Sequence, residues 1–455
     1  ARLLDPEDYG ILTMVMAVTA FAGMFGDLGL STSAIRKKDL TSAQSSNLFW
    51  CTLSLGTILT IVIAAASPVV AWYYQKPAVL WPMEALSANF FLGSLGNLPG
   101  ALLVRRMEFG KRAVASVLGG LVGLAVSITL ALQEARHWAL IAGSLTSTTC
   151  ASLLMILLSG FRPERPSRGS GIREMAGFGL KVTAFDFVNY FHRNLDNLLI
   201  GRFHSTDALG LYSRAYQLLM FPLNNIRGPI NAVALPALGR LQQEPEAFRR
   251  YYRRMLEILA FVSMPFIAFL FVASTPIVEV ALGSRWLGVV PIFSLLAASA
   301  FIQPVMTSWG LVLLSLGQAR RYLTAGIINT GFSAVGFVAG LPWGPEGVAA
   351  GYAIATYAAL IPLLTFAFKQ TPLKLLDFFQ PILISTAASI STTIGMVALA
   401  PLLQMELPLI TLVTQVIVFL ALFISTLIIL PGGWSHAQTN FRLVSGFLPS
   451  KKSAK

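Results

Sequence analysis

Long apolar runs recur from one end of the chain to the other, and they restrict the fold more than any other feature. About 20 apolar residues in a helix span the hydrocarbon core of a bilayer. Hydrophobic residues make up 55% of the chain and charged residues only 12%, about half the charged fraction of a soluble domain. A membrane β-barrel would instead show short segments of alternating polarity. The sequence therefore predicts an all-α polytopic membrane protein.

The positions of these runs predict thirteen spanning helices. We expect them near residues 9–34, 47–72, 79–104, 113–133, 137–160, 175–201, 208–236, 255–274, 288–315, 320–341, 346–368, 376–401 and 408–430. A basic stretch rich in proline, glycine and serine, 162–174, has the composition of a linker. We therefore predict an N-terminal transmembrane lobe (1–161), a cytoplasmic linker (162–174), a C-terminal transmembrane lobe (175–370), two additional transmembrane helices (371–431) and a cytoplasmic tail (432–455).

The positive charges predict the orientation of the chain. Of the 33 lysines and arginines, 24 fall in one set of alternate loops and in the tail, five fall in the other set, and four lie at membrane depth. Cytoplasmic loops carry the excess of lysine and arginine, so the loop after each odd-numbered span and the C-terminal tail are predicted to be cytoplasmic. The net charge of +13 follows from this orientation, and no nucleic-acid partner is expected.

Two halves of the chain share a weak internal repeat. Asp5-Pro6-Glu7-Asp8-Tyr9-Gly10 opens the first span in the same way as Ser205-Thr206-Asp207-Ala208-Leu209-Gly210 opens the seventh. At an offset of 208 residues, Arg112 matches Arg320, Gly123 matches Gly331, and Ala142-Gly143 matches Ala350-Gly351. Transporters are often built from such repeats. We predict two six-helix lobes related by pseudo-two-fold symmetry plus two extra C-terminal helices, with the first transmembrane helix missing from this chain.

The stretch from Lys181 to Pro236 carries too many polar residues for a lipid-facing hairpin. Projected as helices, the polar residues of each span gather in an arc of about 160°. A charge at bilayer depth costs about 2.5–3.5 kcal/mol on insertion scales. The residues expected to line a water-filled, substrate-binding cavity are Lys181, Asp186, Asn189, Arg193, Asp196, Arg214, Asn225 and Arg227. Internal pairing is the alternative, but it leaves a surplus of two positive charges that calls for an anionic partner.

Three prolines, Pro222, Pro229 and Pro236, are spaced by seven in the second helix of this hairpin. Each removes a backbone donor and bends the helix on the same face. The pattern fits a cavity-lining helix that changes shape during transport, or a static kink of the kind common in membrane helices.

Coupling to Na⁺ or H⁺ has only weak candidates. Asp27 is either a coupling carboxylate or a helix-end residue that pairs with Arg36 or Lys37. His192 is either a coupling group, because histidine is the side chain that changes charge near neutral pH, or a hydrogen-bonding residue of the polar face. No metal-ligand spacing, nucleotide-binding loop or catalytic motif is present, so neither an enzyme nor a cofactor is predicted. Cys51 and Cys150 lie in apolar spans and predict neither a disulfide nor a metal site.

Five segments together resemble the polysaccharide transporter family of Wzx-type lipid-linked oligosaccharide flippases. They are Asp5 to Gly10, Asp27 to Ser31, Asp196 to Arg202, Leu209 to Tyr216 and Ala234 to Leu238. The resemblance is to the branch that exports colanic acid and other exopolysaccharides, within the multidrug/oligosaccharidyl-lipid/polysaccharide superfamily. It implies fourteen spans in two six-helix lobes around a central cavity, plus two extra helices.

The resemblance also implies an activity and a location. It implies movement of an undecaprenyl-diphosphate-linked sugar unit across the bacterial inner membrane, with membrane lipids and the polymerase and glycosyltransferases of the same pathway as partners. One alternative is a cation-coupled multidrug antiporter of the same superfamily, for which an acidic cavity would be expected. Another is a non-transporting scaffold of a polysaccharide assembly complex, for which a polar cavity face is unnecessary.

Overall fold

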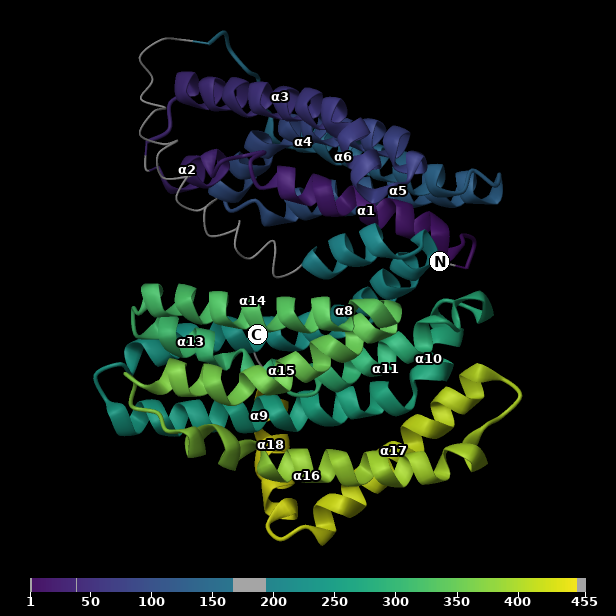
Figure 1. Ribbon diagram of the computed structural model, residues 1–455. Helices are drawn as coiled ribbons and strands as arrows, with labels where there is room; N and C mark the ends of the chain where they lie inside the picture. Colours follow the sequence, from purple (N-terminus) through teal and green to yellow (C-terminus); the bar gives the residue numbers. More distant parts are fainter. Residues whose placement is uncertain (1, 38, 167–193, 448–455) are drawn as a thin grey trace, which may run out of the picture. The chain divides into compact units, whose positions relative to one another are not determined.

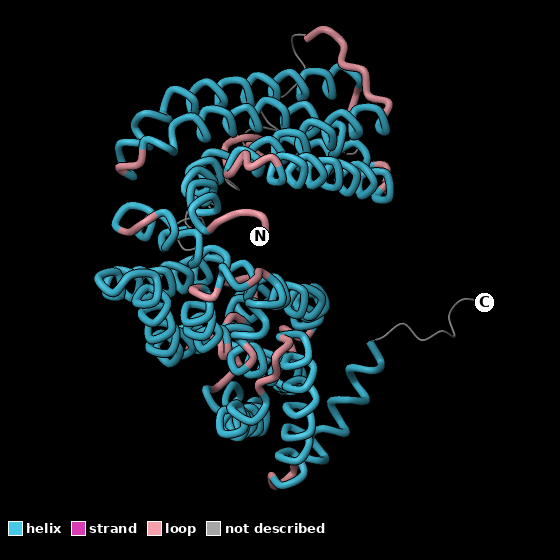
Figure 2. The backbone as a smooth tube through the Cα atoms, turned by 90° about the vertical axis from the view of Figure 1, so that its right-hand side faces the viewer, coloured by secondary structure: helices cyan, strands magenta, loops and turns pink. Residues whose placement is uncertain are grey.

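The computed structural model describes residues 2–37, 39–166 and 194–447, and the regular elements in these ranges are all helices (Figures 1 and 2). Eight helical stretches within them are long and apolar enough to cross a membrane. These are α3 (Ser42–Tyr74), α5 (Phe109–Leu132), α6 (His137–Ser159), α9 (Pro245–Val272), α11 to α13 (Val289–Ser315), α14 and α15 together (Ala319–Phe368), α16 with the turn after it (Leu375–Leu403), and α17 (Pro408–Ile429). The predicted all-α polytopic fold is confirmed.

The other predicted spans are more polar helices. They are α1 (Pro6–Gly23), α4 (Leu80–Arg105) and α8 (Thr206–Arg240). The predicted span 175–201 is described only from residue 194, and 194–203 are helical. The predicted missing helix before α1 is not tested by the structure and stays a prediction.

Two predicted spans are interrupted rather than continuous. The span 9–34 divides into α1 and α2 (Leu30–Arg36), because Leu28 and Gly29 take left-handed backbone angles, with φ of 43° and 68°. The span 288–315 divides into α11 (Val289–Ala300), α12 (Gln303–Met306) and α13 (Ser308–Ser315). Pro304, which cannot donate a backbone hydrogen bond, opens the short middle piece.

The chain forms two compact units, Ala1–Ser213 and Arg214–Lys455, and the boundary between them falls within α8. In the first unit α3 packs on α4, α4 on α6, and α6 on α5 (Figure 1). The α5–α6 contact is close because Gly123 lies against the backbone of Gly143, where an added Cβ would come within 2.5 Å of the carbonyl oxygen. Small residues allow this approach between membrane helices. The predicted division at the linker 162–174 remains untested.

The second unit contains a similar glycine contact between α14 (Ala319–Gly340) and α15 (Gly344–Phe368). A Cβ on Gly336 would lie 2.4 Å from the carbonyl oxygen of Gly351. Gly143 and Gly351, matched in the repeat, thus occupy equivalent contacts. The match of Gly123 to Gly331 is wrong, since no atom lies within 4 Å of a Cβ on Gly331, and Gly336 takes that role. The two-fold relation of the lobes stays a prediction.

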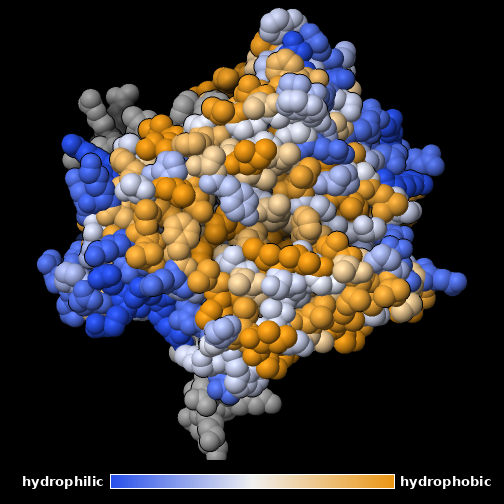
Figure 3. All heavy atoms as spheres, turned by 60° about the horizontal axis from the view of Figure 1, so that its bottom comes forward, coloured by the Kyte–Doolittle hydropathy of each residue, from blue (hydrophilic) through white to orange (hydrophobic). Residues whose placement is uncertain are grey.

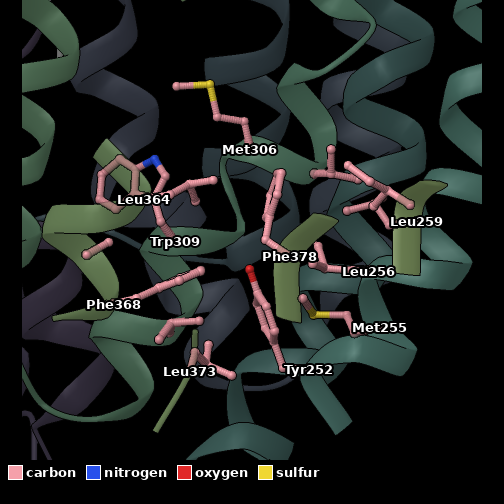
Figure 4. Packing of buried hydrophobic residues seen from close by; sticks show 14 of the residues in the cluster. Tyr252, Met255, Leu256, Leu259, Met306, Trp309, Leu364, Phe368, Leu373 and Phe378 are labelled. Carbon is pink, nitrogen blue, oxygen red and sulfur yellow. The ribbon is translucent and has the colours of Figure 1, made fainter. Parts of the chain in front are cut away.

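The largest described core lies in the second unit, where α8, α9, α12, α13, α15 and α16 meet. Tyr252, Trp309 and Phe378 point into it (Figure 4), and the Tyr252 hydroxyl is 2.9 Å from the Ser308 hydroxyl. The outward faces of α16 and α17 expose large apolar side chains. Apolar side chains cover much of the face shown in Figure 3, as expected for a surface that contacts lipid.

Three arginines in the first turns of α9, which begins at Pro245, pair with carboxylates. Arg249 donates to both carboxylate oxygens of the fully buried Asp377, at 3.1 and 3.2 Å, and Arg253 Nε lies 2.9 Å from the same carboxylate. Arg254 pairs with Glu257. Carboxylates on α9 and α16 therefore pair with all three arginines, which stay partly exposed.

The beginning of the predicted tail is a helix, α18 (Gly433–Phe447). His436 on α18 is buried, with Nδ1 3.0 Å from Glu257 Oε1 and Nε2 3.3 Å from the Ser385 hydroxyl. Asn440 donates to the same Glu257 oxygen at 3.2 Å. These contacts fix α18 against α9 and α16 within the second unit.

Candidate functional site

Five of the predicted site residues lie outside the described part of the chain. They are Lys181, Asp186, Asn189, His192 and Arg193. Asp27, Asp196, Arg214, Asn225 and Arg227 are described. The first two lie in the first compact unit and the other three in the second, so each group is considered within its own unit.

Asp196 is buried and holds the two helices of the hairpin together. Its side chain is 4% exposed. Its carboxylate accepts a hydrogen bond from the Tyr212 hydroxyl at 2.9 Å and from the backbone N–H of Asn197 at 2.8 Å. Tyr212 is itself buried at the start of α8. The geometry gives Asp196 a structural contact, and its predicted place on a cavity surface is untested.

One face of α8 is apolar and buried. Leu209, Ala215, Leu219 and Leu223 recur at helical spacing on this face. The face continues through Ala234 and Leu238 into the core of the second unit. The predicted polar residues lie on the remaining surface of the helix, where Arg214 and Arg227 are half-buried and Gln217, Asn224 and Asn225 are exposed.

Arg227 is oriented by a residue that the sequence did not single out. Its Nη2 donates to the Thr307 hydroxyl at 2.8 Å. Thr307 stands between α12 and α13, and its hydroxyl donates to the Pro304 carbonyl at 3.2 Å. The interruption of the helix near Pro304 therefore places a hydroxyl opposite an arginine of α8. The proline was the only signal in the sequence that this span would be interrupted.

Asn225 makes a local contact. Its side-chain amide donates to the Phe221 carbonyl one turn earlier, at 2.8 Å, and the residue is exposed. The helix runs without interruption from Thr206 to Arg240 through Pro222, Pro229 and Pro236. Whether this proline-rich segment bends during transport stays a prediction.

Asp27 caps the short helix α2. Its carboxylate accepts hydrogen bonds from the backbone N–H of Ser31 at 3.2 Å and from the Ser31 hydroxyl at 2.6 Å. The described contact is thus with Ser31, and pairing with Arg36 or Lys37 stays a prediction. This arrangement satisfies a helix N-terminus, and a coupling role for Asp27 stays untested.

A second polar group lies inside the second unit. The side-chain amide of Gln303 donates to the Ser299 hydroxyl at 3.3 Å and to the Tyr352 hydroxyl at 3.2 Å. Tyr352 stacks on Phe337. This group links α12 to α15. It was not predicted, because a single glutamine in an apolar run does not indicate which residues it contacts. Among the described residues, no cluster of three or more His, Cys, Asp or Glu is suited to a metal ion.

The sequence matches known proteins of surface-polysaccharide biosynthesis. Residues 1–291 match a family described as "Polysaccharide biosynthesis protein". The teichuronic acid biosynthesis protein TuaB of Bacillus subtilis is 26% identical over 303 residues, which cover 66% of this chain and 63% of TuaB. The lipopolysaccharide biosynthesis protein WzxC of Escherichia coli is 24% identical over 390 residues, covering 82% of this chain and 78% of WzxC. The succinoglycan biosynthesis transport protein ExoT of Rhizobium meliloti is 22% identical over 344 residues, which cover 75% of this chain and 70% of ExoT.

Two solved structures share the fold. The lipid II flippase MurJ in an inward closed conformation aligns with a TM-score of 0.73 at 13% identity, over 93% of this chain and 92% of MurJ. An inward-facing multidrug resistance transporter of the MATE family aligns with a TM-score of 0.65 at 16% identity, over 80% of this chain and 91% of the transporter. At such identities the likeness concerns the fold alone. Since the family match covers well over half of the residues, this multi-pass membrane protein belongs to the polysaccharide biosynthesis protein family, and the predicted resemblance to Wzx-type transporters is confirmed.

Proposed function

We propose that this protein is a flippase that moves an undecaprenyl-diphosphate-linked oligosaccharide across the bacterial inner membrane for surface-polysaccharide biosynthesis. It does so by alternating access around a cationic cavity. Its cargo has a lipid tail, a diphosphate and a sugar unit. The diphosphate is the part that a positively charged cavity recognises best.

The observation that carries this proposal is the pair of half-buried arginines on α8, Arg214 and Arg227. A guanidinium presents a planar fork of donors that matches phosphate oxygens, and its charge persists at any physiological pH. The hydrogen bond that Arg227 donates to the Thr307 hydroxyl orients its guanidinium. Lys181 and Arg193, which the sequence predicts as further cations of the site, lie outside the described residues.

Two alternatives fit these residues less well. A cation-coupled drug antiporter needs an acidic site, whereas the polar residues of the hairpin carry a positive surplus. A scaffold without transport has no need of arginines at membrane depth, which are costly to bury. The names of the matched relatives, which include a transport protein, also favour transport.

Coupling and partners extend the proposal. Coupling to Na⁺ or H⁺ is a prediction for which Asp27 and His192 are the candidates, and the bonds from Ser31 give Asp27 a capping role as well. The polymerase and glycosyltransferases of the pathway are the expected protein partners. The expected location is the inner membrane with a cytoplasmic C-terminus.

The test uses alanine and lysine variants in a strain that lacks its flippase. Arg214→Ala, Arg227→Ala and Arg193→Ala should reduce polymer export and increase the lipid-linked intermediate on the cytoplasmic side. Arg227→Lys should restore part of the export, because it keeps the charge but loses the bidentate fork. Arg250, near the start of α9, is exposed, so Arg250→Ala is the matched control and should export normally.

Normal export by all three alanine variants, at protein levels equal to the parent, would refute the cationic site. An accumulated intermediate without a diphosphate would refute the proposed cargo. Extraction of the membrane lipids and mass spectrometry of the glycan-linked species distinguish the two outcomes.

A further inference from the structure

The starts of α1 and α8 cross at a contact that is the same when seen from either helix. A Cβ atom on Gly10 would lie 1.9 Å from the Thr206 carbonyl oxygen, and a Cβ on Gly210 would lie 1.9 Å from the Pro6 carbonyl oxygen. Each glycine thus rests on the carbonyl four residues before the other glycine. Only glycine permits two helix backbones to come this close. All four residues belong to the first compact unit.

This crossing maps onto itself when the two helices are exchanged. Residues 6 and 10 of one helix meet residues 210 and 206 of the other. A contact of this self-complementary kind is what a two-fold axis produces. The two segments are also the ones that the sequence matched as copies of a repeated motif. The crossing therefore has the geometry expected at an axis between two internal repeats.

Residues next to the crossing also contact neighbouring elements of the first unit. Arg136, directly before α6, donates to Glu7 at 2.5 Å and lies 3.5 Å from the buried Asp8. The hydrogen bond to Glu7 is the main reason that the pKa of the Arg136 guanidinium is raised. Gly201 lies against the Tyr74 ring at the end of α3, where an added Cβ would be 2.7 Å from the nearest ring carbon.

The loop charges predict which side of the membrane this is. The residues in these contacts lie at or next to the loops that carry Arg2, Lys76, Arg136 and Arg202. All four loops belong to the set with few lysines and arginines. That set is predicted to lie outside the cytoplasm. Contacts among α1, α8, the end of α3, the helix 194–203 and the residue before α6 thus lie at the predicted outer side.

We propose that the crossing of Gly10 and Gly210 is the outer gate contact of the carrier, closed in this structure and separated when cargo leaves. The inference rests on the proposed transport function. Alternating access requires a contact on each side that forms and breaks. A crossing made of backbone and glycine suits this task, because it can separate without interlocked side chains having to change rotamer. The alternative is a permanent seam that never opens.

Labelling of buried cysteines distinguishes a gate from a seam. In a Cys51→Ser/Cys150→Ser background, single cysteines replace Ile11, Met14 or Leu209, which are at most 4% exposed. A membrane-impermeant maleimide is applied outside intact cells. Gly10→Ala and Gly210→Ala should each raise the labelling rate of at least one reporter about tenfold, equivalent to about 1.4 kcal/mol toward the open form.

Two glycines on the same helices provide matched controls. On α1, the atom nearest to a Cβ on Gly23 is 3.9 Å away, and on α8 a Cβ on Gly228 has no atom within 4 Å. Gly23→Ala and Gly228→Ala should leave labelling unchanged. The double variant Gly10→Ala/Gly210→Ala should label no faster than the stronger single variant, because both changes open one crossing.

Unchanged labelling in both single variants, or an equal rise in the controls, would overturn the gate and leave a permanent seam. Should the alanine variants not reach the membrane, the reporters are compared in the glycine parent with and without the enzyme that starts the lipid-linked glycan. A gate labels differently in the two strains and a seam does not. Labelling of the alanine variants needs no cargo, so its failure is distinct from normal export by the arginine variants, which would refute the proposed function itself.

Discussion

Arg227 and Thr307 form the best-defined contact of the proposed site at the scale of single residues. The hydroxyl of Thr307 accepts from the guanidinium and donates to the Pro304 carbonyl. A hydrogen bond to a charged group is worth about 1.5–3 kcal/mol. Thr307 thus fixes where the charge of Arg227 is presented, even though it is itself uncharged.

Replacing Thr307 tests this positioning role. Thr307→Val keeps the shape of the side chain but removes the hydrogen bond, and should lower export in a flippase-null strain by about five- to thirtyfold, equivalent to about 1–2 kcal/mol. Thr307→Ser keeps the hydroxyl and should export nearly as well as the parent. Similar losses in both variants would show that the methyl group, and not the hydroxyl, matters.

Asp377 supports a second prediction, on stability. Its fully buried carboxylate holds Arg249 and Arg253 and accepts from the backbone N–H of Lys374 at 2.8 Å. Breaking a buried pair costs about 3–5 kcal/mol, but these arginines are 26% and 41% exposed and regain water. Asp377→Ala should therefore cost about 2–3 kcal/mol, seen as a lower midpoint of thermal unfolding in detergent.

Glu246 provides the matched control, because it pairs with the same Arg249 at 3.2 Å but is 73% exposed. Glu246→Ala should change stability by less than about 1 kcal/mol, as is usual for surface pairs. Equal losses from the two variants would mean that burial of Asp377 adds nothing.

At the scale of elements, glycines decide which helices pack closely. The α5–α6 and α14–α15 contacts use Gly143 and Gly351 in the same way, but their partners are Gly123 and Gly336. A fixed offset of 208 residues pairs Gly123 with Gly331 instead. Gly123 and Gly143 are 20 residues apart, whereas Gly336 and Gly351 are 15 residues apart, so no single offset matches both glycines of the pair.

A pair of alanine variants tests this revised match. Gly336→Ala places a methyl group 2.4 Å from the Gly351 carbonyl oxygen and should destabilise the protein by about 1–3 kcal/mol through overpacking. Gly331→Ala meets open space on the same helix and should be neutral or slightly stabilising. Thermal unfolding of the two purified variants provides the comparison, and a larger loss for Gly331→Ala would restore the original match.

At the scale of the whole molecule, loop charge predicts the orientation in the membrane. A green fluorescent protein fused after Lys455 should fluoresce, because the tail is predicted to be cytoplasmic. An alkaline phosphatase fused after Ala135, between α5 and α6, should be active, because that loop is predicted to lie outside. The reverse pattern in full-length, membrane-inserted fusions would invert the topology and place the α1–α8 crossing on the cytoplasmic side.

The sequence by itself determined the fold class, the approximate positions of most described helices and the family. These follow from properties that are local or additive along the chain: apolar length, helical period, loop charge and short motifs. It also located α8 and its arginines, since charge in an apolar run is conspicuous without any knowledge of neighbours.

Only the tertiary structure decided which residues meet. The contacts that matter join residues 16 to 200 positions apart in the sequence. They are Arg227 with Thr307, Asp196 with Tyr212, Asp377 with Arg249, and Gly10 with Gly210. Nothing in a single sequence encodes such pairs directly, because a contact depends on the rotation and depth of two helices at once. The physical reason is that burial stabilises any apolar face in proportion to its area. A hydrogen bond or a glycine crossing forms only when the two helices have one particular distance and orientation.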